Sequence, residues 1–374
     1  MGALKKGEFE GTVTLEPSRV PHVAALKRLF ELWALDKEFH DAYRSDPAGA
    51  LASTGLNVDP RAGALVLLGQ LPEDGGELPE TFTWYRDFFE ERFARGRRNS
   101  LRMQIADPRF AGWRARQMRR CARDMPYMAR FMSHLPLVFE LSLGCSVGCS
   151  FCALSAGRLE GAFRHTEANA ALWKDVLSCM HAAIGGAAGA ALCYYATEPL
   201  DNPDYELFLK DFHNEFGEVP QTTTAAATRD LGRTRELLRW GQQTQLHFDR
   251  LSLLGKRDAD AVLASFTPEE LLYTDLLPQF EEAPACSLKR AGRNLGDSRA
   301  EEGTSACASG FIVNMFERSV RLVTPVVASD EHPTGELVYE KAGFSDGVSL
   351  EGVVRGMIER HMSVTLTLAD LLGR

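Results

Sequence analysis

The chain has 374 residues, of which 45% are hydrophobic and 25% charged, a composition typical of globular proteins and sufficient for one large domain and a smaller one. A net charge of −9 and a pI of about 5.6 exclude general nucleic-acid binding. No stretch reaches the roughly 18 apolar residues that a membrane-spanning helix needs, so we expect no membrane partner.

The eight cysteines indicate a reducing compartment. The sequence starts with MGALKKGE, which lacks the apolar segment of a signal peptide. Thiols in a cytoplasmic protein usually serve metal or redox chemistry rather than disulfide formation. We therefore expect a cytoplasmic protein whose cysteines carry chemistry.

Residues 1–75 are predicted to form a helical N-terminal region. Apolar residues recur there at helical spacing, namely Val23, Leu26, Leu29, Phe30 and Trp33. The next phrase, LDKEFHDAYRSDPAGALASTGLNVDP, predicts a helix, an Asp-Pro break, a short helix, a glycine and a loop. A small helical domain explains this pattern. The phrase also resembles the leader regions of nitrile-hydratase-like peptide precursors, which implies a substrate-related role as the alternative.

A Gly- and Pro-rich break at 71–79 precedes a basic helical segment over 80–130. Its arginines include Arg95, Arg97, Arg98, Arg102, Arg109, Arg114, Arg116, Arg119, Arg120 and Arg123. Two interpretations stay open. The arginines form a solvated face paired with Asp87, Glu90 and Glu91, or they form a surface for an acidic partner such as a peptide leader.

Strands alternate with helices over 131–300, which predicts an α/β protein with a parallel sheet or barrel. The first strand ends at a cysteine-containing loop. Further strands are predicted over Ala190–Ala196, Gln221–Ala227 and Leu246–Leu254, and helices over Glu167–Ile184, Asn202–Phe216 and Asp230–Trp240. The phrase FTPEE from Phe266 predicts one more helix, with Pro268 in its first turn.

A C-terminal extension over 301–374 has a different pattern. Gly310 to Val326 is predicted to form two strands joined near Glu317 and Arg318. Helices over Leu350–His361 and Leu366–Leu372 are predicted to close the chain.

Three cysteines follow the first strand at C-x3-C-x2-C spacing: Cys145, Cys149 and Cys152. Iron–sulfur clusters are held by cysteine thiolates, normally four for a 4Fe–4S cluster. Three thiolates on one loop can hold three irons and leave the fourth iron open to another molecule. The alternatives are a structural zinc site, for which a fourth ligand at suitable spacing is absent, and a disulfide, which needs an oxidising compartment.

This spacing after a strand, with the aromatic Phe151 before the last cysteine, resembles the radical S-adenosylmethionine (SAM) superfamily. The resemblance implies a partial (β/α)6 TIM-like barrel with the cluster at the C-terminal ends of the strands. It also implies one 4Fe–4S cluster, S-adenosyl-L-methionine as cofactor, and an electron donor such as flavodoxin or ferredoxin.

Polar residues at later strand ends are candidate SAM ligands by this resemblance. Thr197 and Glu198 stand where the superfamily often has Gly-Gly-Glu-Pro, which binds the amino group of SAM. The alternative for Glu198 is a carboxylate at a helix N-terminus. Arg250 and Ser252 stand where a polar residue meets the ribose or the SAM carboxylate. An ion pair with Asp249 or an outward-facing arginine is the other interpretation of Arg250.

Longer phrases resemble the proteusin-type peptide epimerases that mature ribosomal peptides. These phrases are CSVGCSFCALSAGRLEGAF, CYYATEPLDNPDYE, FTPEELL and ACASGFIVNMFERSVRLVTP, in the same order over about residues 100–345. The resemblance implies an enzyme that converts L-residues to D-residues in a ribosomally synthesised precursor peptide. Another radical SAM peptide modification, such as cross-linking, is the alternative enzyme. A peptide-binding protein with a relic cluster is the alternative outside the enzymes.

The implied epimerisation needs a thiol that returns a hydrogen atom to Cα. We expect Cys307 in this role, with Cys286 as the second candidate, because reactive thiols are partly exposed. Cys179 and Cys193 are expected in the core, and Cys121 is the least suited. An auxiliary cluster needs about four close cysteines, so we expect only one cluster.

Overall fold

The computed structural model describes residues 13–69, 76–102, 105–129, 132–244 and 249–363. The predicted break at 71–79 falls mostly outside the described residues, and the helix predicted at Leu366–Leu372 falls wholly outside them.

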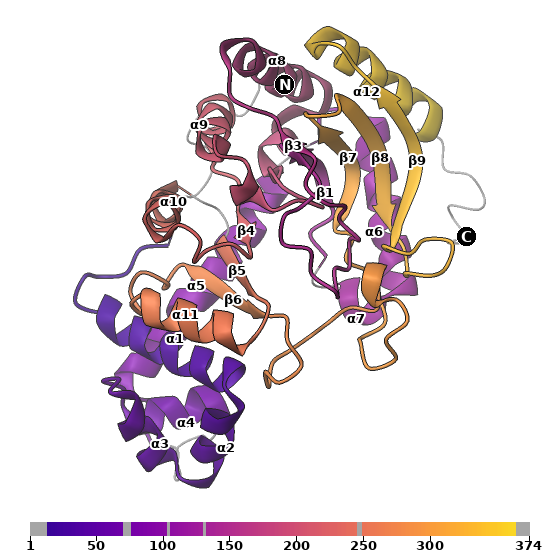
Figure 1. The fold of residues 1–374 in the computed structure, drawn as a ribbon. Coiled ribbons are helices and arrows are strands. Elements are labelled where there is room, and N and C mark those ends of the chain that lie inside the picture. Colours follow the sequence, from indigo (N-terminus) through magenta and orange to yellow (C-terminus); the bar gives the residue numbers. More distant parts are fainter. Residues whose placement is uncertain (1–12, 70–75, 103–104, 130–131, 245–248, 364–374) are drawn as a thin grey trace. The chain divides into compact units, whose positions relative to one another are not determined.

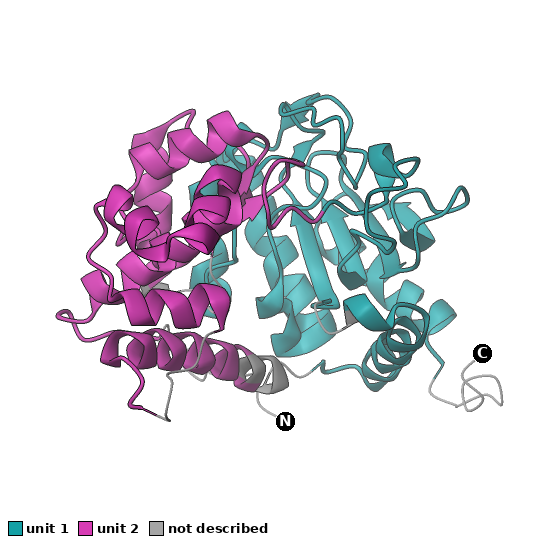
Figure 2. Cartoon of the chain, turned by 90° about the horizontal axis from the view of Figure 1, so that it is seen from below, with its two compact units in different colours: residues 1–9, 100–222, 288–374 teal, residues 10–99, 223–287 magenta. Residues whose placement is uncertain are grey.

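Two compact units make up the chain, and each is discontinuous in sequence (Figure 2). The first unit joins Ser100–Thr222 to Leu288–Arg374, and the second joins Glu10–Asn99 to Thr223–Ser287. Each unit therefore combines stretches of chain that lie far apart in the sequence.

A four-stranded sheet forms the centre of the first unit, in the order β1-β7-β8-β9 (Figure 1). Its strands are β1 (Leu135–Glu140), β7 (Ala308–Asn314), β8 (Ser319–Pro325) and β9 (Glu336–Gly343). Strand β1 pairs with β7 in parallel, and the other pairs are antiparallel. Every residue of β1 and β7 is buried, as expected for a parallel pair covered on both faces.

Close contact between β1 and β7 depends on a glycine. A Cβ atom at Gly310 would lie 2.0 Å from the carbonyl oxygen of Pro136, so only glycine fits there. The hairpin predicted over Gly310–Val326 is confirmed as β7 and β8. Its turn contains Arg318 at φ 53°, and the Asn314 side chain accepts a hydrogen bond from the Glu317 N–H at 2.8 Å.

The first unit also contains helices. They are α6 (Pro108–Asp124), α7 (Pro126–Ala129), α8 (Glu167–Ile184), α9 (Tyr205–Phe216) and α12 (Gly347–His361). Of these, α6 and α12 contact strands of the sheet. The bounds of α8 match the prediction, and Thr166 caps its N-terminus by accepting from the Asn169 N–H at 3.3 Å. Helix α8 packs against α9 and α12 (Figure 1).

The prediction of a strand over Ala190–Ala196 is wrong, because this segment forms no continuous series of backbone pairs. Residues Gly185–Ala190 form a 3-10 helix, and only Leu192 bridges to Val138 of β1. The Phe139 N–H donates to the Leu192 carbonyl at 2.8 Å. The small residues before Leu192 fold into a tight helical turn, so this segment has one point of pairing rather than a strand.

The second unit contains helices α1 (Val20–Leu35), α2 (Lys37–Ser45), α3 (Pro47–Thr54), α4 (Pro60–Leu68), α5 (Glu80–Arg102), α10 (Leu231–Thr244) and α11 (Lys256–Ser265). A parallel sheet runs β4-β5-β6, with β4 (Thr223–Thr224), β5 (Asp249–Leu253) and β6 (Thr274–Pro278). The strand predicted over Gln221–Ala227 is thus reduced to two residues, and that over Leu246–Leu254 is described from Asp249.

The helical pattern predicted before Pro60 is confirmed. The Asp46 side chain caps α3 by accepting from the Gly49 N–H at 3.0 Å, and Gly55 ends this helix at φ 67°. Helices α1 to α4 share a core cluster of Leu26, Leu29, Tyr43, Ala50, Leu51 and Ala62. These helices therefore bury an apolar core of their own.

The helix predicted after Phe266 is wrong. Thr267 and Glu270 do make the reciprocal contacts of a helix start, each side chain accepting from the other's N–H, at 3.2 and 2.9 Å. However, Leu271 and Leu272 turn into the core and the chain enters β6. A helix cap sets where a turn begins but not how long the helix is, and tertiary burial decides the rest.

The prediction of an α/β protein is confirmed to the extent that helices and sheets both occur. Over the residues that the structure describes, the sheets have four, two and three strands, and none closes on itself. The partial barrel therefore stays a prediction.

His134 enters β1 with an unusual backbone and a buried ring. Its φ is 46°, its side chain is 2% exposed, and its Nδ1 lies 2.8 Å from the Ser309 hydroxyl. Burial, followed by the positive charges of Arg114 and Arg120, lowers the pKa of His134 to about 4.

Below pH 6.5, His134 becomes protonated in the unfolded chain but stays neutral in the folded protein. The free energy of unfolding therefore decreases as the pH falls from 6.5 toward 4. We expect the thermal midpoint of the metal-free protein to fall less steeply over this range in His134→Asn, since asparagine tolerates the left-handed backbone. The partly exposed His332→Asn serves as control. Equal slopes for His134→Asn and the unsubstituted protein would contradict this account.

Candidate functional site

The three motif cysteines lie on a loop that leaves the C-terminal end of β1. Strands β2 (Ser142–Leu143) and β3 (Gly161–Ala162) pair in antiparallel fashion at the base of this loop. The Cys145 N–H donates to the Gly157 carbonyl at 2.9 Å. Gly144 has φ 80°, and a Cβ there would lie 2.0 Å from the Arg158 carbonyl oxygen. The segment between the two strands, which we call the cysteine loop, is therefore closed by backbone contacts.

All three thiols are partly buried and free of disulfides. The Val147 N–H points to Cys145 Sγ and the Ala156 N–H to Cys152 Sγ, each at 3.4 Å. Burial raises the pKa of Cys149, and the neighbouring thiolates of Cys152 and Cys145 raise it further. The thiols are thus close enough to repel one another when ionised, and a bound cation would relieve that repulsion.

Among the described residues, no group of three or more His, Cys, Asp or Glu side chains is arranged around a single metal-ion position. Thiolates that hold a cubane cluster each bind a different iron, so they need not converge on one point. The donor chemistry of the cysteine loop fits such a cluster because thiolates are the ligands that iron–sulfur clusters take.

The Glu198 segment lies beside the cysteine loop. Glu198 is 3% exposed and accepts from the Leu200 N–H at 3.1 Å, at the start of a 3-10 helix over Pro199–Asp201. Glu198 therefore makes the contact of a carboxylate at a helix N-terminus, which was the alternative to SAM binding for this residue. Its charge, like that of Asp201, also acts to raise the pKa of Cys145, for which burial is the main cause. Thr197 precedes it and is partly exposed.

Asp201 binds the loop directly and was missed by sequence reasoning. Its carboxylate accepts from the Ser146 N–H at 2.8 Å and from the Ser146 hydroxyl at 2.5 Å. An aspartate after Glu-Pro-Leu gives no signal of this contact, because the two residues are 55 positions apart.

Arg293 binds the loop from another part of the chain and was also missed. It lies in the 3-10 helix Gly292–Asn294. Its Nη1 donates to the Cys149 carbonyl at 2.7 Å, and its backbone N–H donates to the Cys152 carbonyl at 3.0 Å. The only sequence signal is a glycine beside an arginine, which is too common to identify the contact.

Cys307 lies immediately before β7, and its carbonyl accepts from the Leu135 N–H at 2.9 Å. Its partly buried side chain packs in an apolar cluster that includes Leu154 of the cysteine loop, Tyr195 and Ala196. The structure therefore brings together, in the first unit, the three motif cysteines, Phe151, Thr197, Glu198 and Cys307.

The remaining candidates belong to the second unit. Cys286 packs against an apolar core cluster that contains Leu253 and Phe280. Arg250 is exposed on β5, and Ser252 is partly buried two residues further on the same strand. Arg250 also faces like charge, since it lowers the pKa of Arg92, for which burial is the main cause.

The other cysteines lie largely in packed regions. Cys193 is fully buried, and burial raises its pKa. Cys121 is buried with its Sγ 3.5 Å from the Pro325 carbonyl oxygen. Cys179 of α8 is partly buried against α12, where a Cβ at Gly347 would lie 2.9 Å from its sulfur.

A buried ion pair that the sequence did not reveal lies at the end of β1. Glu140 is 4% exposed and accepts from Arg321 of β8 through both oxygens, at 3.0 and 3.3 Å. Arg321 also binds Glu336 at 3.3 Å. Burial alone would lower the pKa of Arg321, but these two carboxylates outweigh it and raise the pKa. The Ala196 N–H donates to Glu140 as well, at 3.3 Å, so this pair anchors the segment before Thr197.

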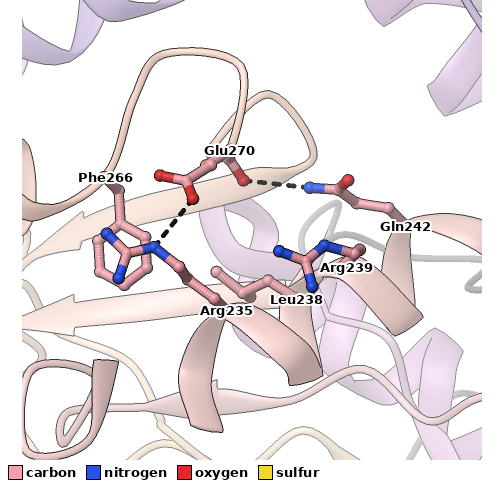
Figure 3. A pocket seen from close by; sticks show the side chains of 6 residues that line it. All are labelled: Arg235, Leu238, Arg239, Gln242, Phe266 and Glu270. Carbon is pink, nitrogen blue, oxygen red and sulfur yellow. Dashed lines mark hydrogen bonds and ion pairs between the residues drawn. The ribbon is translucent and has the colours of Figure 1, made fainter. Parts of the chain in front are cut away.

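Two of the hollows lined by described residues lie in the second unit. The smaller, of about 50 Å³, is lined by Arg235, Leu238, Arg239, Gln242, Phe266 and Glu270 (Figure 3). Arg235 donates to Glu270 at 2.9 Å and lies over the Phe266 ring, so this hollow has room for little more than water. The larger is an open hollow on α5, lined by Asp87, Glu90, Glu91, Phe93 and Ala94.

Several arginines of the basic segment have structural partners. Arg95 and Arg98 pair with Glu91 at 2.7 and 2.8 Å, which agrees with a solvated, ion-paired face. Arg114 donates to the His134 carbonyl at 2.7 Å, and Arg120 to the Thr324 hydroxyl at 3.2 Å. The side chains of Arg97 and Arg102 lie outside what the structure describes. A surface for an acidic partner stays a prediction.

Fold and site together define a mixed α/β protein with a tri-cysteine loop at the end of its first long strand. The uncharacterized protein y4wI of Sinorhizobium fredii is 32% identical over 386 aligned positions, which cover 96% of this chain and 74% of the relative. The chain belongs to the family of this protein. No protein-family profile matches the sequence, and no solved structure matches it. Within the described ranges, no helix combines the length and apolar character needed to cross a membrane.

Proposed function

We propose that this protein is a cytoplasmic radical SAM enzyme that holds one 4Fe–4S cluster with Cys145, Cys149 and Cys152. The observation that carries the proposal is the cysteine loop itself. It leaves the C-terminal end of a buried parallel strand, it is closed at its base by β2 and β3, and Asp201 ties it to the Glu198 segment. Enzymes with parallel α/β barrels place their chemistry at this end of the strands, which supports a partial barrel.

Residues of the chain would hold SAM beside the cluster. Glu198 offers a buried carboxylate near Cys145, and Thr197 a hydroxyl next to it, as acceptors for the SAM ammonium group. Phe151 lies on the cysteine loop itself. The role of Arg250 and Ser252 as ligands of the SAM carboxylate and ribose stays a prediction from the resemblance.

When bound, the cluster and SAM supply the one-electron chemistry that moves a Cα hydrogen atom of a peptide residue to the 5′-carbon of the adenosyl group. We propose that Cys307 then breaks its S–H bond and returns a hydrogen atom to the opposite face of Cα, which converts an L-residue to a D-residue. The Cys307 sulfur regains one electron from a reductant such as flavodoxin or ferredoxin and one proton from solvent. The substrate is a ribosomally synthesised precursor peptide.

The proposed epimerisation predicts deuterium uptake. Thiol hydrogens exchange with solvent, so the anaerobically reconstituted enzyme, with SAM, a reductant and the precursor peptide encoded beside it, should add one deuterium at each inverted Cα in D2O. The measurement is the peptide mass together with chiral analysis after hydrolysis, and the control is the same reaction without SAM.

A product of different mass, formed with deoxyadenosine but without deuterium at Cα, would replace epimerisation by another radical SAM peptide modification. Failure to form deoxyadenosine with any reductant and peptide would contradict the enzyme class itself.

A further inference from the structure

The cysteine loop is held from two sides by charged residues of opposite sign. Arg293 binds it from the segment before β7, and Asp201 binds it from the segment after Glu198. Both residues lie in the first unit, far from the loop in sequence.

Arg293 contacts the loop at three carbonyl oxygens. Its guanidinium donates to the carbonyls of Cys149, at 2.7 Å, and of Ala156, while its backbone N–H donates to that of Cys152 at 3.0 Å. Two of these carbonyls belong to the cysteines of the motif. A planar guanidinium can span two acceptors in fixed geometry, which a lysine ammonium cannot do in the same way.

The neighbouring glycine allows this contact. Gly292 has φ 59°, and a Cβ there would lie 2.4 Å from the Cys152 carbonyl oxygen and 2.5 Å from that of Ala153. The Gly292 N–H donates to the Pro333 carbonyl at 2.7 Å, which anchors the segment on its other side. The backbone of this segment therefore packs directly on the cysteine loop.

Asp201 contacts the opposite part of the loop. Its two oxygens accept from the N–H and the hydroxyl of Ser146, the residue that follows Cys145. The two charges thus act on different cysteines. The Arg293 guanidinium binds the carbonyl of Cys149 itself, whereas the Asp201 carboxylate binds the residue next to Cys145.

We infer that Arg293 and Asp201 are positioning residues that fix the cysteine loop and that, by their opposite charges, set the reduction potential of the cluster that it would hold. This inference rests on the proposed function, since it needs a cluster on the loop. Reduction adds one negative charge to a cluster. A nearby cation stabilises the reduced state and raises the potential, whereas a nearby anion lowers it.

The test uses the full chain with a reconstituted cluster and compares Arg293→Gln, Arg293→Lys and Asp201→Asn. Asparagine keeps the shape of aspartate and can still accept from the Ser146 N–H. Arg299→Gln is the matched control, because Arg299 is exposed and pairs with Asp297 at 3.0 Å. Iron content is measured first, and the midpoint potential is then measured by redox titration followed by electron paramagnetic resonance at low salt.

We expect Arg293→Gln to shift the potential negatively and Asp201→Asn to shift it positively. Each shift should change the ratio of reduced to oxidised cluster about tenfold at a fixed solution potential, or about 59 mV for a one-electron couple. Arg293→Lys keeps the positive charge, so its midpoint potential should stay near that of the unsubstituted protein. It loses the planar guanidinium that spans two carbonyl oxygens, so its iron content should fall. Arg299→Gln should change neither.

Shifts of the same sign in Arg293→Gln and Asp201→Asn would overturn the inference, because loosening of the loop alone gives no reason for opposite signs. Unchanged potentials in both variants would overturn it as well. If Arg293→Gln fails to fold, Asp201→Asn alone tests the inference. A positive shift of its midpoint potential would support the inference, and a negative shift would overturn it. An unsubstituted protein that holds no iron would contradict the proposed function instead, which separates the two failures.

Discussion

Cys149→Ala should abolish both the iron–sulfur chromophore and the cleavage of SAM. Under the proposed function the three motif thiolates each hold one iron, and the loop offers no replacement ligand. We expect iron to fall from about four atoms per chain to background, as loss of a cluster ligand requires. Deoxyadenosine formation should become undetectable. The measurements are iron content, visible absorbance and chromatography of the nucleoside product.

The matched control for Cys149→Ala is Cys179→Ala. Cys179 is also a partly buried thiol, but it lies on α8 and packs against α12. We expect this control to keep the chromophore and SAM cleavage. A full iron complement in Cys149→Ala would contradict the assignment of the cysteine loop as the cluster site. Equal loss in both variants would show general thiol sensitivity and would contradict it too.

Cys307→Ala should separate SAM cleavage from epimerisation. The cluster ligands and Glu198 are untouched, so deoxyadenosine should still form in the presence of peptide. Without the thiol no hydrogen atom returns to Cα. The yield of D-residues and the deuterium uptake in D2O should therefore fall to background. The iron content should stay unchanged.

Packing around Cys307 is the physical reason to expect this split. Its side chain shares an apolar cluster with Leu154 of the cysteine loop and with Ala196, which precedes the proposed SAM ligands. A partly exposed thiol next to such a site can reach a peptide that enters it.

Cys286→Ala is the matched control for Cys307→Ala. Cys286 was the second candidate for the hydrogen donor, and its side chain packs against the core cluster of the second unit. We expect this variant to keep the formation of D-residues. The reverse result, with epimerisation lost in Cys286→Ala and kept in Cys307→Ala, would transfer the donor role to Cys286.

Local patterns in the sequence were sufficient for many elements of the fold. Helix α8 has the predicted bounds because its threonine cap and apolar spacing act within a few residues. The β7–β8 hairpin was predictable for the same reason, since its two strands are joined by a short turn at Arg318. Strand β9 was not predicted, because its residues are mostly half-exposed and lack a clear apolar alternation.

Pairings between distant segments could not be derived in this way. Strand β1 pairs with β7 although the two strands lie far apart in the sequence, as Leu137 and Phe311 show, and no local pattern specifies that partner. The segment after Ala190 illustrates the opposite error. Its apolar run predicted a strand, but only Leu192 pairs, since the preceding glycines and alanines form a 3-10 turn.

The sequence by itself determined the cysteine motif, its place after a buried strand and the α/β character, because these depend on spacing and on local apolar patterns. Only the tertiary structure decided which residues surround the cysteine loop. Asp201 and Arg293 reach it through hydrogen bonds over 55 and 144 residues. The pair of Glu140 and Arg321 forms over 181 residues. Such contacts depend on how the folded backbone brings segments together, and no spacing along the chain encodes them.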